Sequence, residues 1–207
     1  MKTPYDKDTY SIWKMLQDLE WDMYLDTPVG VFSVDGLPGA EMTGGVLNRV
    51  LNGRTCLDIG CGALAKPAYI RAAPDVIFTG VDPYLGNVER EFNFIEGFAE
   101  ELPFGDKTFD GALFATSLDH IGNPQKAISE AHRILKDEGN LFIWLTHRPI
   151  DEQYLSWKST GGQYDKYHIQ AFTPESVKEL TESLFVETET FTHKHNPNEC
   201  LYIFRKC

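Results

Sequence analysis

The 207-residue chain has no long hydrophobic run, since none of its apolar stretches approaches the ~20 residues that a bilayer-spanning helix needs. Its first ten residues are polar and lack the apolar core of a secretory signal. We therefore expect a cytoplasmic protein that does not associate with membranes.

Clusters of positive charge are also missing. The chain has 19 lysines and arginines against 31 acidic residues, a formal net charge of -12. A surface this negative repels phosphate backbones and anionic lipids. We expect no nucleic-acid partner, and a small molecule as the ligand. Composition gives no prediction of the oligomeric state.

Cysteines are few, and their spacing forms neither a CxxC pair nor a zinc-binding pattern: Cys56, Cys61, Cys200 and Cys207. Reduced thiols are the expectation. His193 and His195, even combined with His147, have a spacing that favours a solvated loop over metal ligands. We expect no metal from this pattern.

Short apolar segments alternate with helix-like stretches over much of the chain. Five segments are predicted to be strands: Thr55–Ile59, Val76–Val81, Asn93–Glu96, Phe109–Ala115 and Leu141–Leu145. Helices are predicted over Ala65–Ala73 and Pro124–Leu135, with Gly139 as a stop signal after the second. This alternation favours parallel strands joined by right-handed crossovers.

The C-terminal part has a different pattern. Thr173-Pro174-Glu175 begins a predicted helix that runs to about Ser183. Two predicted strands follow, Phe185–Phe191 and Cys200–Phe204, close enough for a hairpin with an antiparallel last strand. The predicted fold is α/β and Rossmann-like: a doubly wound, mostly parallel seven-stranded sheet with helices on both faces.

We expect one domain over residues 1–207, with two segments outside the alternating pattern. Residues 1–50 form a helical cap, which includes an amphipathic helix over Asp6–Tyr24. Its aromatic residues either pack on the sheet or form a lid over the acceptor: Tyr10, Trp13, Trp21 and Tyr24. Residues 148–171 form a polar, aromatic insertion near the acceptor site.

The strongest functional motif is a buried strand that leads directly into a glycine turn, with Gly60 and Gly62 two positions apart. Glycine at such a turn lets a ligand approach the main chain closely. Asp82 ends the second strand, 24 positions after Asp58, where an acid can accept hydrogen bonds from ribose hydroxyls. By itself, the glycine motif also fits a purely structural turn.

Several further segments occur in a specific order, and with them the chain resembles the class I S-adenosylmethionine-dependent methyltransferases from about Arg54 to Trp144. The segments that carry the resemblance are Leu57-Asp58-Ile59-Gly60-Cys61-Gly62, the stretch from Glu96 to Leu102-Pro103-Phe104, Phe109–Phe114, Leu118-Asp119-His120-Ile121 and Ala131–Leu141. The resemblance implies S-adenosyl-L-methionine as cofactor and S-adenosyl-L-homocysteine as product.

The resemblance also implies roles for the first turn. Gly60 and Gly62 let the backbone pass close to the cofactor, Asp58 reaches its amino group, and Asp82 holds the ribose. The family commonly has a third glycine where this chain has Leu64, so the geometry of this turn around the methionine part stays open.

Two more segments are implied to contact the cofactor. Phe98, Ala99 and Glu100 line the adenine pocket. Three residues just after the fourth strand face the sulfonium: Thr116, Ser117 and Leu118.

Three histidines follow predicted strands or the insertion and are the candidate catalytic residues: His120, His147 and His168. An imidazole suits removal of a proton from a hydroxyl, although each histidine also has a structural interpretation. The expected reaction is in-line methyl transfer to an oxygen or nitrogen of a small-molecule acceptor.

Two other classes of protein are compatible with part of this pattern. The first is a non-catalytic S-adenosylmethionine-binding sensor or partner subunit. The second is a nicotinamide dehydrogenase, whose glycine pattern the first turn would tolerate. The Leu-Pro-Phe and Leu-Asp-His segments argue against the dehydrogenase.

Overall fold

The structure is a computed structural model, and it describes residues 3–26, 34–84, 89–148 and 168–207. Its helical elements are α1 (Lys7–Asp26), η1 (Val34–Gly36), α2 (Ala40–Leu51), α3 (Ala68–Arg71), η2 (Leu118–His120), α4 (Pro124–Ile134) and α6 (Pro174–Thr181). Its strands are β1 (Thr55–Ile59), β2 (Ile77–Asp82), β3 (Asn93–Glu96), β4 (Phe109–Ala115), β5 (Leu135–Thr146), β6 (Phe185–His193) and β7 (Asn196–Lys206).

The seven strands form one sheet in the order β3-β2-β1-β4-β5-β7-β6. Strands β1 to β5 pair in parallel, whereas β7 runs antiparallel to both β5 and β6. The predicted fold class and the antiparallel last strand are confirmed. The carboxyl ends of the parallel strands therefore meet at one edge, where open α/β sheets bind their ligands.

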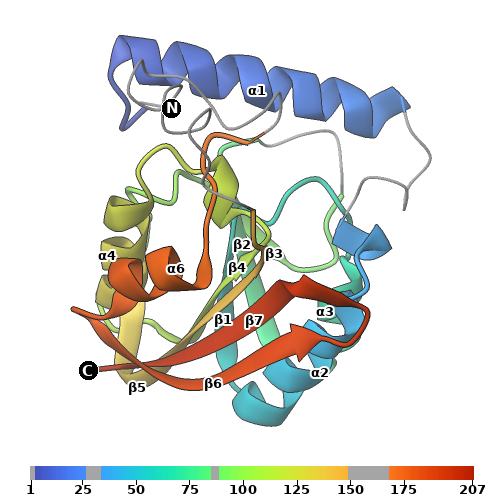
Figure 1. The fold of residues 1–207 in the computed structure, drawn as a ribbon, viewed down its shortest axis with the longest axis vertical. Helices are drawn as coiled ribbons and strands as arrows, with labels where there is room; N and C mark the ends of the chain where they lie inside the picture. Colours follow the sequence, from blue (N-terminus) through green and yellow to red (C-terminus); the bar gives the residue numbers. More distant parts are fainter. Residues whose placement is uncertain (1–2, 27–33, 85–88, 149–167) are drawn as a thin grey trace.

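Helices cover both faces of the sheet because its central strands are apolar on both sides. In β1, Leu57 and Ile59 pack into the core beneath α4 and α6, whereas Cys56 faces the core beneath α2 and α3. This alternation follows from the two-residue period of a strand. Figure 1 shows α4 and α6 on one side of the sheet, with α2 and α3 on the other.

Two helix boundaries differ from the sequence prediction. The helix predicted over 65–73 is only α3, and Pro67 stands immediately before it. The predicted stop at Gly139 is wrong, because α4 ends at Ile134 and β5 follows directly. A Cβ at Gly139 would lie 2.9 Å from the Lys136 carbonyl oxygen, so glycine serves close backbone packing there.

Helix α1 lies across one end of the molecule, over the rest of the fold (Figure 1). It is held there by aromatic contacts, in which the Trp13 ring lies 5.3 Å from Phe98 and 6.2 Å from Tyr84, centroid to centroid. Leu16 is fully buried in the same helix. Since Tyr84 and Phe98 follow β2 and β3, α1 covers the carboxyl ends of these strands.

Among the described residues, no helix is long and apolar enough to cross a membrane. The cytoplasmic location stays a prediction. Most of the insertion at 148–171 and the side chains of Trp21 and Tyr24 lie outside what the structure describes.

Candidate cofactor and acceptor site

The glycine turn after β1 has the backbone that only glycine adopts readily. Gly60 has φ 76° and Gly62 has φ 65°, both in the left-handed region. A Cβ on Gly60 would lie 2.5 Å from the Ser117 Cβ, whereas a Cβ on Gly62 would meet nothing within 4 Å. The backbone is thus packed against the segment after β4 at Gly60 and open to a ligand at Gly62.

The Asp82 carboxylate lies beside this turn at the end of β2. Its Oδ2 accepts a hydrogen bond of 2.9 Å from the Gly62 amide, and its Oδ1 accepts one of 2.8 Å from the Tyr84 amide. Two backbone donors therefore orient the carboxylate toward the glycine turn. An anionic acceptor fixed in this way fits the recognition of ribose hydroxyls.

Asp58 is fully buried in β1, one residue before the end of the strand. Tyr69 donates a 2.7 Å hydrogen bond to its Oδ2, while its Oδ1 has no hydrogen-bond partner. Burial raises the pKa of Asp58 to about 7, against the opposing effect of the Tyr69 hydroxyl. An orphaned, buried acceptor of this kind fits a cationic group such as the cofactor's amino group.

Arg90 supports the other side of the glycine turn. Its Nη2 donates a 2.7 Å hydrogen bond to the Gly62 carbonyl, and its guanidinium lies 3.8 Å from the Phe94 ring centroid. This contact fixes the segment in which Leu64 replaces the family's third glycine.

The predicted adenine segment, Phe98 to Glu100, is buried. The Phe98 ring lies 5.5 Å from Tyr5 and 5.3 Å from Trp13, so the N-terminal segment covers it. Glu100 Oε1 accepts a 3.0 Å hydrogen bond from the Asn123 amide, and burial raises the pKa of Glu100. Any adenine contact here would form beneath the helical cap.

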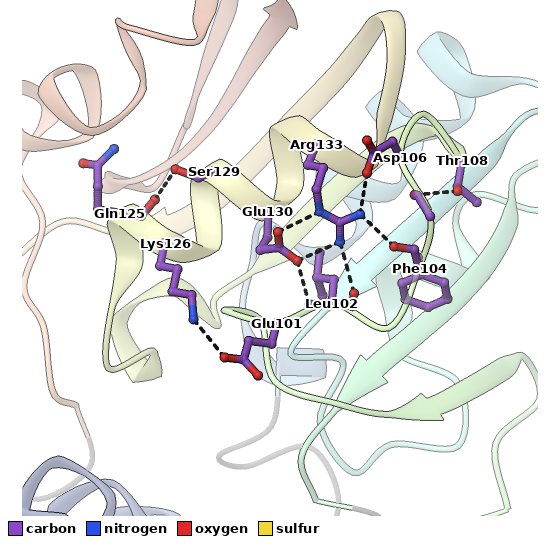
Figure 2. A network of polar contacts seen from close by, with 11 residues as sticks. Glu101, Leu102, Phe104, Asp106, Thr108, Gln125, Lys126, Ser129, Glu130 and Arg133 are labelled. Atoms are coloured by element: carbon purple, nitrogen blue, oxygen red, sulfur yellow. Dashed lines mark hydrogen bonds and ion pairs between the residues drawn. The ribbon is translucent and has the colours of Figure 1, made fainter. Parts of the chain in front are cut away.

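Arg133 of α4 anchors the chain just after this segment (Figure 2). Its guanidinium donates to the carbonyls of Leu102 (3.1 Å) and Phe104 (2.8 Å), as well as to the carboxylates of Asp106 and Glu130. Glu130 in turn accepts a 2.9 Å bond from the Leu102 amide. Several donors in one planar fork thus fix the loop against α4.

The segment after β4 passes over the glycine turn. Thr116 has φ 55°, an uncommon backbone for a residue other than glycine. Ser117 Oγ donates a 2.5 Å hydrogen bond to the Ile59 carbonyl, which joins this segment to the end of β1, just before the turn. The Leu118 side chain lies in the core, so only its backbone is available to a cofactor.

Both ring nitrogens of His147 have protein partners. Nδ1 lies 3.0 Å from the Phe172 carbonyl oxygen and Nε2 lies 2.6 Å from the Tyr202 hydroxyl. The carbonyl can only accept, so Nδ1 carries the proton and Nε2 accepts from Tyr202. Burial lowers the pKa of His147. This arrangement ties β5 to β7 and to the segment before α6.

His120 and His168 lie together, with ring centroids 4.8 Å apart. Arg148 contacts Asp119 and His168: its Nη1 donates to Asp119 Oδ2 (2.6 Å), and its Nη2 lies 2.9 Å from His168 Nε2. His120 and Asp119 end η2, after β4. Two of the three predicted histidines are thus brought together at the carboxyl edge of the sheet.

Sequence reasoning assigned no role to Asp119, Arg148 or Tyr69. Asp119 and Arg148 each adjoin a predicted histidine in the sequence, which was the available signal. Tyr69 gave none, because only the packing of α3 on β1 brings its hydroxyl to Asp58.

The strand order, the glycine turn and the acid at the end of β2 together define the class I methyltransferase fold. Residues 57–143 match the family described as "Methyltransferase domain". The central part of the chain thus matches a methyltransferase domain, which confirms the family resemblance over residues 57–143.

Three similar proteins illustrate the range of the family. O-methyltransferase rstn1 of Aspergillus nomiae is 31% identical over 105 residues, 45% of this chain and 47% of that protein. The ubiquinone/menaquinone biosynthesis C-methyltransferase UbiE of Brucella canis is 46% identical over 101 residues, 42% of this chain and 36% of that protein. The chain spans about half the length, or less, of these relatives.

A solved structure matches over the whole chain. It is the 1,6-didemethyltoxoflavin-N1-methyltransferase of Burkholderia thailandensis with bound 1,6-didemethyltoxoflavin and S-adenosylhomocysteine. The TM-score is 0.68 at 16% identity, covering 100% of this chain and 93% of that one, which shows a shared fold. The three names specify oxygen, carbon and nitrogen as methylated atoms, so the fold leaves the acceptor atom open.

Proposed function

We propose that the chain is an S-adenosylmethionine-dependent methyltransferase that transfers a methyl group in line to an oxygen or nitrogen of a small-molecule acceptor. The observation that carries this proposal is the Asp82 carboxylate, held by two backbone amides beside the open backbone of Gly62. This combination suits a ligand with a ribose and an adjacent group that needs close main-chain approach.

The residues along the carboxyl edge fit this cofactor in a consistent order. Asp82 would hold the ribose, Gly60 and Gly62 would pass beneath the sugar and the carboxylate, and Asp58 would receive the amino group. The remaining residues that we propose to contact the cofactor are Phe98, Ala99, Glu100, Thr116, Ser117 and the backbone of Leu118. When bound, the cofactor supplies a sulfonium methyl group, which is already an activated electrophile.

The chain itself must therefore align the acceptor and exclude water. Alignment contributes ~7–11 kcal/mol, against ~3–5 kcal/mol for a general base. Helix α1 supports water exclusion, since Trp13 is buried over Phe98.

We place the acceptor beside His120 and His168 and keep all three histidines as candidate catalytic residues. The acceptor loses its proton during transfer, and an imidazole at this edge is suited to receive it. His147 is the least available of the three because Phe172 and Tyr202 engage both of its nitrogens.

The proposal is tested by calorimetric titration with S-adenosylhomocysteine, S-adenosylmethionine and, as a control, NADH. We expect binding of the two adenosyl ligands only. Asp82→Ala should weaken S-adenosylhomocysteine binding by about 1.5–3 kcal/mol, because a charged hydrogen-bond acceptor is lost. Asp82→Asn, which keeps one acceptor for the Gly62 amide, should lose less.

Two outcomes would change the assignment. Unchanged affinity in Asp82→Ala would remove the ribose role from that residue. Tight adenosyl binding without methyl transfer to any member of a broad acceptor panel would favour a sensor or partner subunit instead.

A further inference from the structure

A carboxylate and two imidazoles converge at the carboxyl edge of the sheet. They belong to Asp119, His120 and His168, and each residue has a potential metal-ligand atom within 4.8 Å of those of the other two. The cluster joins two segments far apart in the sequence. The amides of Ile169 and Gln170 both donate 3.0 Å hydrogen bonds to the Asp119 carbonyl, so the backbone itself fixes His168 beside Asp119.

Asp119 carries an unused acceptor in this cluster. The residue is only 6% exposed, and its Oδ1 has no hydrogen-bond partner. His120 Nε2 lies 3.7 Å from that oxygen, too far for a hydrogen bond but close to the spacing of two ligands on one metal ion. A buried carboxylate oxygen without a donor is costly, and a cation would satisfy it.

Arg148 is hydrogen-bonded to the other carboxylate oxygen of Asp119, Oδ2. Its 2.6 Å contact with Asp119 Oδ2 orients the carboxylate as an outer partner of a metal ligand does. Its second contact, at 2.9 Å from His168 Nε2, competes with a metal for that nitrogen. A cation that uses His168 must therefore displace one guanidinium contact, which predicts weaker binding than at a structural zinc site.

We propose that Asp119, His120 and His168 form a binding site for a divalent transition-metal ion, with Zn²⁺ as the reference ion. Two imidazoles favour Zn²⁺ or Co²⁺ over Mg²⁺, which prefers oxygen ligands. Three protein ligands leave a coordination position open, as in metal sites that act on a substrate. The side chains of His120 and His168 are 17% and 18% exposed, so the site opens to solvent on the imidazole side.

This site deepens the proposed function and, in its chemical consequence, rests on it. A metal with an open position would bind an acceptor hydroxyl and lower its pKa, so the proton could pass to solvent water. His120 and His168 would then serve as metal ligands in place of the base role proposed above. The acceptor class that follows is a hydroxyl compound. Metal binding itself does not depend on methyl transfer and can be measured without an acceptor.

The experiment is calorimetric titration of the metal-stripped full chain with Zn²⁺ and, separately, with Mg²⁺. We expect one equivalent of Zn²⁺ to bind and Mg²⁺ to bind far more weakly. Asp119→Asn, His120→Ala and His168→Ala should each weaken Zn²⁺ binding at least about tenfold. The control His193→Ala/His195→Ala removes the other histidine pair, whose rings lie 5.9 Å apart, and should bind like the wild type.

Spectroscopy of the Co²⁺-substituted wild type keeps the test independent of whether a variant folds. Visible bands of a nitrogen- and oxygen-ligated ion support the site, whereas strong near-ultraviolet thiolate bands would assign the metal to a cysteine such as the exposed Cys207 and overturn it. Absence of Zn²⁺ binding, or its loss only in the His193/His195 control, would also overturn it. Titration with S-adenosylhomocysteine in parallel separates these results from failure of the proposed function.

Discussion

Asp58 combines complete burial with an acidic group whose pKa is raised to about 7 by that burial. In an unfolded chain the same group has a pKa near 3.8. Between these two values the folded state binds more protons than the unfolded state, so the free energy of unfolding falls as pH rises from about 4 to about 7.

We predict that Asp58→Asn flattens this part of the pH profile. The effect is at most about 4 kcal/mol, since one pKa unit corresponds to about 1.4 kcal/mol. Urea unfolding of both proteins at several pH values from 4 to 8 measures it. A variant with the same pH slope as the wild type would show that Asp58 does not titrate in this range.

Ligand binding should show the opposite pH trend. Ionised Asp58 attracts the amino group of S-adenosylhomocysteine, so affinity should rise with pH through about 7 in the wild type and stay level in Asp58→Asn. Calorimetry at pH 6 and pH 8 distinguishes the two cases.

His147 should contribute more to stability than to binding. We expect His147→Ala to lower the free energy of unfolding by about 1–3 kcal/mol, because Phe172 and Tyr202 lose a buried partner. S-adenosylhomocysteine affinity should not change. Tyr202→Phe removes one of the same bonds, so the double variant should lose less than the sum of both changes. Additive losses would mean that the ring does not bridge these residues.

Single-residue roles were predictable where a motif fixes both spacing and chemistry. Gly62 and Asp82 follow from the ends of β1 and β2, and a hydrogen bond joins them as the pattern indicates, while their roles toward a cofactor stay a prediction. The partners of His147 were not predictable, because Tyr202 approaches it only through the antiparallel pairing of β5 with β7. The sequence predicts no metal site and offers only His147, His193 and His195 as possible ligands, whereas the fold brings Asp119, His120 and His168 together.

At the scale of elements, α4 and the loop from Glu101 to Asp106 act together through Arg133 (Figure 2). We predict that Arg133→Lys lowers the free energy of unfolding by about 1–3 kcal/mol, since one ammonium cannot reproduce a fork to two carbonyls and two carboxylates. Thermal unfolding measures this effect. Because the loop follows Phe98 and Glu100, S-adenosylhomocysteine affinity should fall as well.

Lys126→Ala provides the matched control on the same helix and loop. Its ion pair with Glu101 is solvent-exposed, with side chains 45% and 57% accessible, and contributes at most about 1 kcal/mol. Equal losses in Arg133→Lys and Lys126→Ala would contradict a specific role for the Arg133 fork.

Element types were predicted better than element ends. Three strands, β1, β3 and β4, have the predicted bounds, because short apolar runs bounded by polar turns specify them locally. The end of α4 lies one residue from the predicted one, but Gly139 is not its stop: the glycine lies within β5, and its constraint is the nearby Lys136 carbonyl. Close backbone packing has no signature in hydrophobic periodicity.

For the whole molecule, the net charge of -12 acts at long range on any charged ligand. S-adenosylmethionine carries one more positive charge than S-adenosylhomocysteine, on its sulfonium. We predict that the association rate of S-adenosylmethionine falls severalfold between about 0.01 M and about 1 M salt, over which the Debye length shrinks from roughly 30 Å to 3 Å. Stopped-flow fluorescence with both ligands measures this, and an equal salt dependence for both would contradict it.

The strand order also dictates when the fold can be completed. β7 lies between β5 and β6, yet it is synthesised after both of them. A nascent chain that has reached β6 therefore presents the backbone of β5 as an open sheet edge, and such edges recruit other chains. Pairing of β7 covers this edge and so ends the period in which the nascent chain is prone to aggregate. Chains halted before β7 emerges should therefore depend most on chaperones in the cell.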